Sequence, residues 1–207
     1  TGLLILFCGL LFSASLAISK GAFQIPAGRL LDWLTGSPGA LDAVSTNVLI
    51  SIRLPRVLLG LIAGAALGSA GAAMQALFRN PLAEPGLVGL SAGASLGAIT
   101  AIVLTPGGFL LIAAFAFTGS VITTQLAFVL GKKSRGMSGL LLAGVAINTI
   151  AFSLMGLIII SADDTQLRDL TFWSMGSLAG ASWPVLAYLG PWVLLGVVVV
   201  MGRWRVL

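Results

Sequence analysis

Long apolar stretches that carry few charges constrain the fold of this sequence more than any other feature. A helix that crosses a lipid bilayer needs about 20 predominantly apolar residues. Stretches of this kind recur along the chain, with polar or Gly/Pro-rich connectors between them. Their approximate ranges are 3–18, 57–77, 87–104, 109–130, 137–160 and 184–201. The pattern predicts an all-α membrane protein, a polytopic bundle of about six transmembrane helices.

The composition excludes a soluble enzyme or a soluble binding module. Hydrophobic residues make up 58% of the chain and charged residues only 8%, whereas about a quarter of an ordinary soluble domain is charged. Too few polar side chains remain to cover a water-facing surface. The net charge of +5 arises from 11 basic and 6 acidic residues. In so apolar a chain we interpret the basic residues as anchors at helix ends, and we expect no nucleic-acid partner.

The sequence contains no catalytic or metal-ligating constellation. It has no histidine and a single cysteine, Cys8, which excludes a disulfide within this chain, a His-based metal site and Cys–His catalysis. The run from Gly131 to Ser134 resembles the end of a phosphate-binding loop, but residue 126 is Leu where that motif requires Gly. We therefore expect no cofactor in this chain and no enzymatic activity. Energy for any transport must come from another subunit or from an ion gradient.

Two connectors are long enough to hold structure of their own. The first runs from Lys20 to Pro55 and could contain a short surface helix. The second runs from Ser161 to Trp183. Its semi-apolar core of about a dozen residues is too short to span a bilayer, so it predicts a short interfacial or re-entrant helix, of which we favour the re-entrant form.

The basic residues of the connectors give a weak indication of orientation. They divide between the two sides of the predicted topology almost evenly, but one set lies in short connectors directly beside helix ends, where basic residues mark the cytoplasmic side. That set consists of Arg79, Lys132, Lys133, Arg135, Arg203 and Arg205. The basic residues predicted on the opposite side are Lys20, Arg29, Arg53, Arg56 and Arg168.

Two rows of glycines predict close helix packing. Residues four apart lie on one face of a helix, so each row forms a groove without side chains into which a neighbouring backbone can pack. Glycine costs about 1 kcal/mol relative to alanine in an exposed helix, which favours a packing role. The same pattern is typical of any dense helical bundle and carries no functional information by itself. The rows are Gly60, Gly64 and Gly68, and Gly89, Gly93 and Gly97.

Two polar motifs flank the second apolar stretch. Arg53 and Arg56 precede it, three residues apart, so in a helix both guanidinium groups could point the same way and bind carboxylates. On spacing alone, anchoring to lipid headgroups is the stronger interpretation. Asn80 and Pro81 follow the stretch and predict a sharp, rigid stop, which by itself is a plain turn.

Several runs resemble the FecCD family, the permease subunits of ABC importers for siderophores, hemin and vitamin B12. The similarity in order and spacing extends along most of the chain. The runs that carry it are Arg53-Leu54-Pro55-Arg56, the glycine row that follows, the segment from Met74 to Ser95, Leu140 to Ala146, and Phe172 to Leu178.

The resemblance implies a single permease domain over residues 1–207 that holds the first six of about ten helices. It also implies a homodimer in the bacterial inner membrane, with two ATPase subunits on the cytoplasmic side that bind ATP and Mg. A periplasmic binding protein would deliver the ligand. The family pattern continues beyond its sixth helix into an ATPase-docking loop and four more helices, which lie outside this sequence.

The resemblance also suggests roles for individual residues. Arg53 and Arg56 would face the periplasm and meet glutamates of the binding protein, which raises docking above lipid anchoring. The cytoplasmic gate would involve Asn80, Leu82, Gly136, Met137 and Ser138. The translocation pathway would be lined by Asn148, Ser153, Trp173, Met175 and Gly176.

Among the ligands of this family we favour hemin over siderophore or cobalamin, because Gln166 to Trp183 resembles the hemin-permease versions of that segment. An ion-coupled secondary transporter or channel is the main alternative, and a structural membrane subunit is a third. The predicted membrane helices hold almost no ionisable residue, whereas proton- or sodium-coupled carriers usually need acids or histidine near the midplane. This argues against the secondary transporter.

Overall fold

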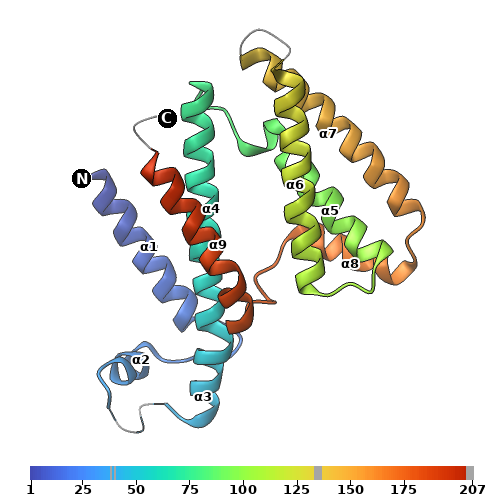
Figure 1. Cartoon of the computed structure of the whole chain (residues 1–207). Coiled ribbons are helices and arrows are strands. Elements are labelled where there is room, and N and C mark those ends of the chain that lie inside the picture. Colours follow the sequence, from blue (N-terminus) through green and yellow to red (C-terminus); the bar gives the residue numbers. More distant parts are fainter. Residues whose placement is uncertain (38, 40, 133–136, 204–207) are drawn as a thin grey trace. The chain divides into compact units, whose positions relative to one another are not determined.

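The computed structural model describes the chain except residues 38, 40, 133–136 and 204–207. Helices and the turns between them make up the described part (Figure 1). In chain order the elements are α1 Gly2–Ser19, α2 Ala27–Leu34, α3 Ala43–Asn47, the π-helix η1 Val48–Arg53, α4 Leu54–Phe78, the 3-10 helix η2 Pro85–Val88, α5 Leu90–Leu104, α6 Phe109–Gly131, α7 Met137–Ile160, α8 Asp164–Met175 and α9 Trp183–Gly202.

The six apolar stretches form the helices α1, α4, α5, α6, α7 and α9, so the prediction of an all-α membrane fold is confirmed. Each helix end lies within three residues of the expected one. Among the residues that the structure describes, five stretches are long and apolar enough to cross a membrane: α1, the continuous helical stretch Ala43–Phe78, α6, most of α7, and α9. The remaining apolar helix, α5, has only 15 residues.

The start of α5 corrects one sequence-based expectation. Residues 87–89 were expected inside the third apolar helix, but Leu87 and Val88 belong to η2, and Gly89 lies one residue before α5. Gly89 has a φ of 87°, a left-handed conformation that glycine adopts without steric cost. The hydrophobic pattern continues through this break, which is why it did not reveal the turn. The helix α5 therefore has 15 residues, fewer than the roughly 20 of a full crossing.

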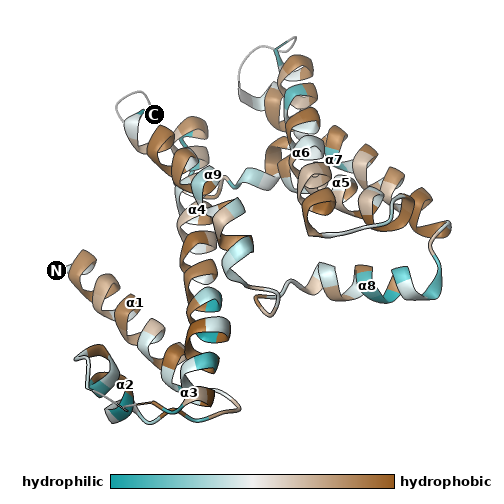
Figure 2. Cartoon of the chain, turned by 60° about the horizontal axis from the view of Figure 1, so that its bottom comes forward, coloured by the Kyte–Doolittle hydropathy of each residue, from teal (hydrophilic) through white to brown (hydrophobic). Residues whose placement is uncertain are grey.

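The two longer connectors each contain a helix, as expected, and Figure 2 shows hydrophilic residues in both α2 and α8. Helix α2 is amphipathic, with Leu30, Leu31 and Leu34 beside Arg29 and Asp32. Helix α8 starts with a capping box. The Asp163 carboxylate accepts from the Gln166 backbone N–H at 2.8 Å, and the Gln166 side chain accepts from the Asp163 backbone N–H at 3.1 Å.

By its internal contacts the chain divides into two compact units. Unit 1 comprises Thr1–Leu67 and Leu178–Gly202, and unit 2 is built on Gly68–Ser177. In unit 2 the helices α5, α6 and α7 pack side by side (Figure 1). A buried cluster of Ile99, Val103, Met155 and Leu170 joins α5, α7 and α8. Because these residues of α5 and α7 lie in their last two turns, α8 packs at one end of the bundle. The re-entrant form of α8 stays a prediction.

Backbone contact between α5 and α6 sets the spacing of unit 2. A Cβ atom placed on Gly97 would overlap the Phe115 carbonyl and lie 3.0 Å from the Ala116 nitrogen. A Cβ atom on Gly93 would lie 2.9 Å from the Gly119 carbonyl carbon, and one on Gly119 would lie 3.3 Å from the Gly97 Cα. Because no side chain fits there, the two helices touch through their main chains.

Unit 1 is packed much more loosely. No residue of α1 is buried. In α4, a Cβ atom on Gly60 would meet only the end of the Leu178 side chain, at 3.5 Å. Within the described chain no neighbouring atom lies within 4 Å of a Cβ atom on Gly64. The Trp183 indole N–H, at the start of α9, donates to the Ile50 carbonyl of η1 at 3.0 Å.

Candidate functional site

Arg53 is the last residue of η1, and its side chain is committed to the backbone of a neighbouring segment. Its guanidinium donates to the carbonyls of Ile18, Ser19 and Phe23, the second at 3.0 Å. Ile18 and Ser19 end α1, where carbonyls have no partner within the helix. With only 7% of its surface exposed, Arg53 acts as the C-terminal cap of α1.

Arg56 lies one turn later in α4 and has a different environment. It is exposed, and it makes no hydrogen bond or ion pair with any residue that the structure describes. The two arginines therefore do not form a matched pair in this conformation: Arg53 faces the end of α1, and Arg56 keeps a free guanidinium. Their docking role stays a prediction, and of the two only Arg56 offers an accessible positive charge.

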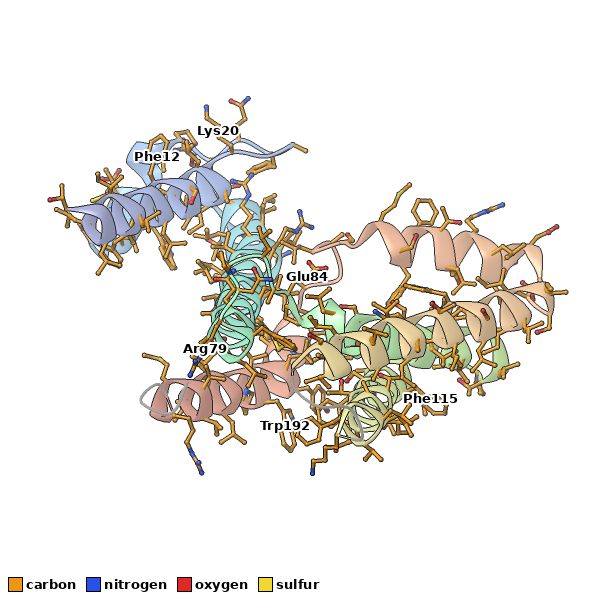
Figure 3. All side chains as sticks on the ribbon, turned by 90° about the horizontal axis from the view of Figure 1, so that it is seen from above. Phe12, Lys20, Arg79, Glu84, Phe115 and Trp192 are labelled. Carbon is orange, nitrogen blue, oxygen red and sulfur yellow. The ribbon has the colours of Figure 1, made fainter. Side chains whose placement is uncertain are left out.

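The turn after α4 is held by its own backbone. The Arg79 and Asn80 N–H groups donate to the carbonyls of Ala76 at 3.2 Å and Gln75 at 3.1 Å, which is the Schellman pattern of a helix C-terminus. Arg79 has a φ of 48°. The Asn80 side chain accepts from the Leu82 N–H at 2.9 Å, so the sharp stop expected from Asn80 and Pro81 is present. Figure 3 labels Arg79 and Glu84 on this segment.

The turn exposes an apolar side chain, because Leu82 is 85% exposed whereas the following Ala83 is buried. The other residues predicted for the gate lie around the start of α7. Ser138 is exposed. Met137 is the first residue of α7, but its side chain lies outside the described part, as does all of Gly136. The gate assignment therefore stays a prediction, with Leu82 as its most accessible described side chain.

Helices α6 and α7 hold η2 in place. The Asn148 side-chain amide donates to the Gly86 carbonyl at 3.0 Å, and the Thr123 hydroxyl donates to the Gly89 carbonyl at 2.8 Å. A Cβ atom on Gly144 would overlap the Leu87 carbonyl, so α7 passes directly against the 3-10 turn. The connector between α4 and α5 thus ends in a segment fixed by two helices.

The predicted pathway residues have separate surroundings. Asn148 is half-buried and holds η2, although its side-chain oxygen has no hydrogen-bond partner among the described residues. Ser153 is exposed and donates to the Thr149 carbonyl of its own helix at 2.9 Å. Trp173, Met175 and Gly176 are all exposed at the end of α8, where Gly176 has a φ of 72°. The pathway-lining role of this set stays a prediction.

Sequence reasoning missed three residues that organise unit 2: Gly119, Thr123 and Gly144. None belongs to a repeating pattern. An isolated glycine within an apolar helix is itself a signal, because it lowers helix stability by about 1 kcal/mol and therefore suggests a close approach. Gly119 and Gly144 both fit that description.

The arrangement offers surfaces for contact rather than groups for catalysis. No group of three or more His, Cys, Asp or Glu side chains that could hold a metal ion occurs among the residues that the structure describes. The Thr123, Asn148 and Ser153 side chains of unit 2 bind the protein's own backbone. The accessible features include the Arg56 guanidinium and the Leu82 side chain.

Comparison with known sequences gives a family match along nearly the whole chain. The family model of the FecCD transport family matches residues 7–207. The hemin transport system permease protein HmuU of Yersinia pestis is 43% identical over 146 residues, which cover 68% of this chain and 44% of HmuU. The vitamin B12 import system permease protein BtuC of Escherichia coli is 39% identical over 168 residues, which cover 80% of this chain and 46% of BtuC.

Comparison with solved structures agrees with this family match. A structure described as an inward-facing conformation of a metal-chelate type ABC transporter superposes with a TM-score of 0.81 at 27% sequence identity. The superposition covers 95% of this chain and 60% of that chain. The chain thus spans about half the length of the curated relatives that it matches.

Proposed function

The chain belongs to the FecCD transport family, and on that premise we propose that it forms part of the membrane-spanning permease of an ATP-driven importer. The observation that carries the proposal is the family match over residues 7–207, together with the superposition over 95% of the chain. In this proposal the permease is a homodimer in the bacterial inner membrane. Two separate ATPase subunits bind ATP and Mg, and a periplasmic binding protein delivers the cargo.

The cargo that we propose is a bulky metal chelate or corrinoid, with hemin ahead of siderophore and cobalamin. HmuU and BtuC, named for hemin and vitamin B12, are 43% and 39% identical to this chain. So small a difference does not separate the two cargoes, and our preference rests on the segment from Gln166 to Trp183.

The distribution of charge supports an importer driven by a partner subunit over an ion-coupled carrier. Across the six apolar helices the only acidic or basic side chain is that of Arg56, near the start of α4. A proton- or sodium-coupled carrier usually places ionisable side chains near the midplane of the membrane. In our proposal the energy comes from ATP hydrolysis elsewhere in the complex.

Uptake into vesicles tests the proposal. The intact permease that contains this chain is reconstituted with its ATPase and binding protein, and hemin, a ferric siderophore and cobalamin are offered in parallel. We expect uptake that requires ATP and stops with vanadate, with hemin transported fastest. Uptake that continues while ATP hydrolysis is blocked contradicts the importer, whereas faster uptake of cobalamin contradicts only the choice of cargo.

A second experiment tests the docking role of Arg56. Because this guanidinium is exposed and has no partner among the described residues, we expect Arg56→Glu to weaken association with the binding protein, most strongly at low salt. Lys132→Glu is the matched control, since Lys132 is also exposed and lies on the predicted cytoplasmic side. Equal affinities of the Arg56→Glu and wild-type permeases rule out the docking role.

A further inference from the structure

Unit 1 contains a cavity of about 500 Å³ between the second half of α1, the connector that follows it, and the start of α4. Its volume falls within the roughly 300–1,000 Å³ typical of small-ligand sites. Its lining combines small residues, such as Ala14 and Ala17 on α1 and Gly60 on α4, with larger apolar side chains, and most of the lining surface is apolar. The cavity can therefore take an apolar group.

Three basic residues also line this cavity: Lys20, Arg53 and Arg56. Lys20 is exposed directly after the end of α1 (Figure 3). Arg53 is buried, and its hydrogen bonds go to neutral carbonyls. A guanidinium has five N–H donors and a permanent charge, so carbonyls alone leave that charge without a counter-ion.

No acidic residue lines the cavity to balance these charges. The acids of unit 1 are Asp32 and Asp42. Asp42 is held elsewhere, since the neighbouring Ser45 hydroxyl, with a smaller effect from Arg29, keeps the pKa of its carboxyl below the ordinary value. The cavity thus combines an apolar wall with an excess of positive charge at one end.

We propose that this cavity binds one anionic glycerophospholipid, with its phosphate against Lys20 and Arg53 and an acyl chain along Ala14, Ala17 and Gly60. The lipid phosphate supplies the missing negative charge. The acyl chain fills a surface that a soluble anion leaves empty. A neutral lipid would fill the apolar wall but leave the three cations unbalanced. The position of Lys20, at the end of a membrane-length helix, is where a headgroup lies.

Lipid binding to the intact permease that contains this chain tests the proposal. Native mass spectrometry or spin-label spectroscopy compares dioleoyl phosphatidylglycerol with dioleoyl phosphatidylcholine at equal acyl composition. Each basic residue near a headgroup contributes about fivefold in affinity, so two predict a preference of about 25-fold for phosphatidylglycerol that falls with salt. Equal binding of the two lipids overturns the proposal.

Charge variants locate the headgroup. Lys20→Gln should lower phosphatidylglycerol binding about fivefold and leave phosphatidylcholine binding unchanged. Lys132→Gln is the control, since Lys132 belongs to unit 2 and does not line the cavity. Because the Lys20 side chain is exposed and makes no described hydrogen bond, while its backbone N–H bonds Leu16 in any variant, the variant should fold normally. Equal losses of phosphatidylglycerol binding in Lys20→Gln and Lys132→Gln contradict the placement of the headgroup beside Lys20.

A bulk variant locates the acyl chain. Ala17→Leu adds volume to the cavity wall without a change of charge and should displace the lipid. Gly9→Leu is its control, because Gly9 also lies in α1 but outside the cavity. Retained lipid preference in Ala17→Leu overturns the proposal. Inorganic phosphate should not compete, and displacement by it would assign the site to a small anion instead. Loss of the lipid on dimerisation would assign the cavity to a second copy.

Discussion

Glycines four residues apart occur in both α4 and α5, yet the two helices use them differently. Gly93 and Gly97 of α5 lie against the backbone of α6, whereas Gly64 and Gly68 of α4 have no neighbour within 4 Å of a Cβ position in the described chain. The sequence pattern is the same in both helices. A glycine row therefore makes close approach possible, but the neighbouring helix decides whether close approach occurs. In unit 2 that neighbouring helix is α6, which supplies a glycine of its own, Gly119.

The two units also differ in how their helices are joined. In unit 2 main-chain contact between α5 and α6 is combined with a buried apolar cluster. In unit 1 none of α1 is buried, and the end of this helix is held by the side chain of Arg53. Unit 2 therefore depends on the absence of side chains at a few positions, and unit 1 on the presence of one long polar side chain.

The largest effect is expected where backbones touch. Gly97→Ala should lower the free energy of unfolding by about 3 kcal/mol, at the upper end for overpacking, because the new Cβ atom meets main-chain atoms that cannot rotate away. Gly64→Ala is the matched control and should be neutral or stabilise by up to about 1 kcal/mol. SDS-induced unfolding in mixed micelles, followed by circular dichroism, measures both. Similar losses in the two variants would show that α4 is as tightly packed as α5.

The next effect concerns the cap of α1. Arg53→Gln should cost about 2 kcal/mol, since hydrogen bonds from a charged donor to three carbonyls are lost or weakened. Arg56→Gln has no described partner to lose and should leave the same unfolding curve unchanged. Protease cleavage of the connector after Ser19 gives a second readout, because the Arg53 variant should expose it. If the two variants unfold alike, Arg53 does not hold α1.

The comparison also shows which features a sequence can predict. Hydropathy is a local property, and it placed the ends of the six apolar helices within three residues. Gly89 was assigned to a helix because the apolar pattern runs through η2 without interruption, and the break depends on Asn148 and Thr123 from other helices. Interactions between distant segments leave no local pattern for the sequence to reveal.

The site residues likewise divide into those set by nearby residues, which the sequence predicts, and those set by distant segments, which it does not. The turn at Asn80 was predictable, since its hydrogen bonds join residues close in sequence. The environments of Arg53 and Arg56 were not, because spacing alone treats the two as equivalent. Their difference arises from Ile18 and Ser19, more than thirty positions away. Gly119 was not predicted because α6 has no row of glycines four residues apart like that of α5.

A smaller effect is expected from the contact that holds η2 in unit 2. Asn148→Leu should lower the free energy of unfolding by about 1 kcal/mol, because the Gly86 carbonyl loses its donor. Ser153→Ala is the control in the same helix, since the exposed Ser153 hydroxyl bonds only its own helix, and it should change little. The same SDS titration measures both. A loss as large as that of Gly97→Ala would show that polar contacts, rather than backbone packing, dominate unit 2.

The smallest effect concerns a cap in unit 2 that parallels Arg53. The Gln166 amide donates to the Val103 carbonyl near the end of α5 at 3.1 Å, while its oxygen accepts from the Asp163 N–H. Because α5 is already fixed by α6, loss of this cap should cost less than loss of Arg53.

Gln166→Glu keeps the acceptor and removes only the donor, so we expect the free energy of unfolding to fall by about 0.5 kcal/mol, against about 1 kcal/mol for Gln166→Ala. Hydrogen exchange at the end of α5 separates the two roles, because both variants should speed exchange there and only Gln166→Ala should do so at the start of α8. If Gln166→Glu lowers the free energy of unfolding as much as Arg53→Gln does, both units depend on such caps to the same degree.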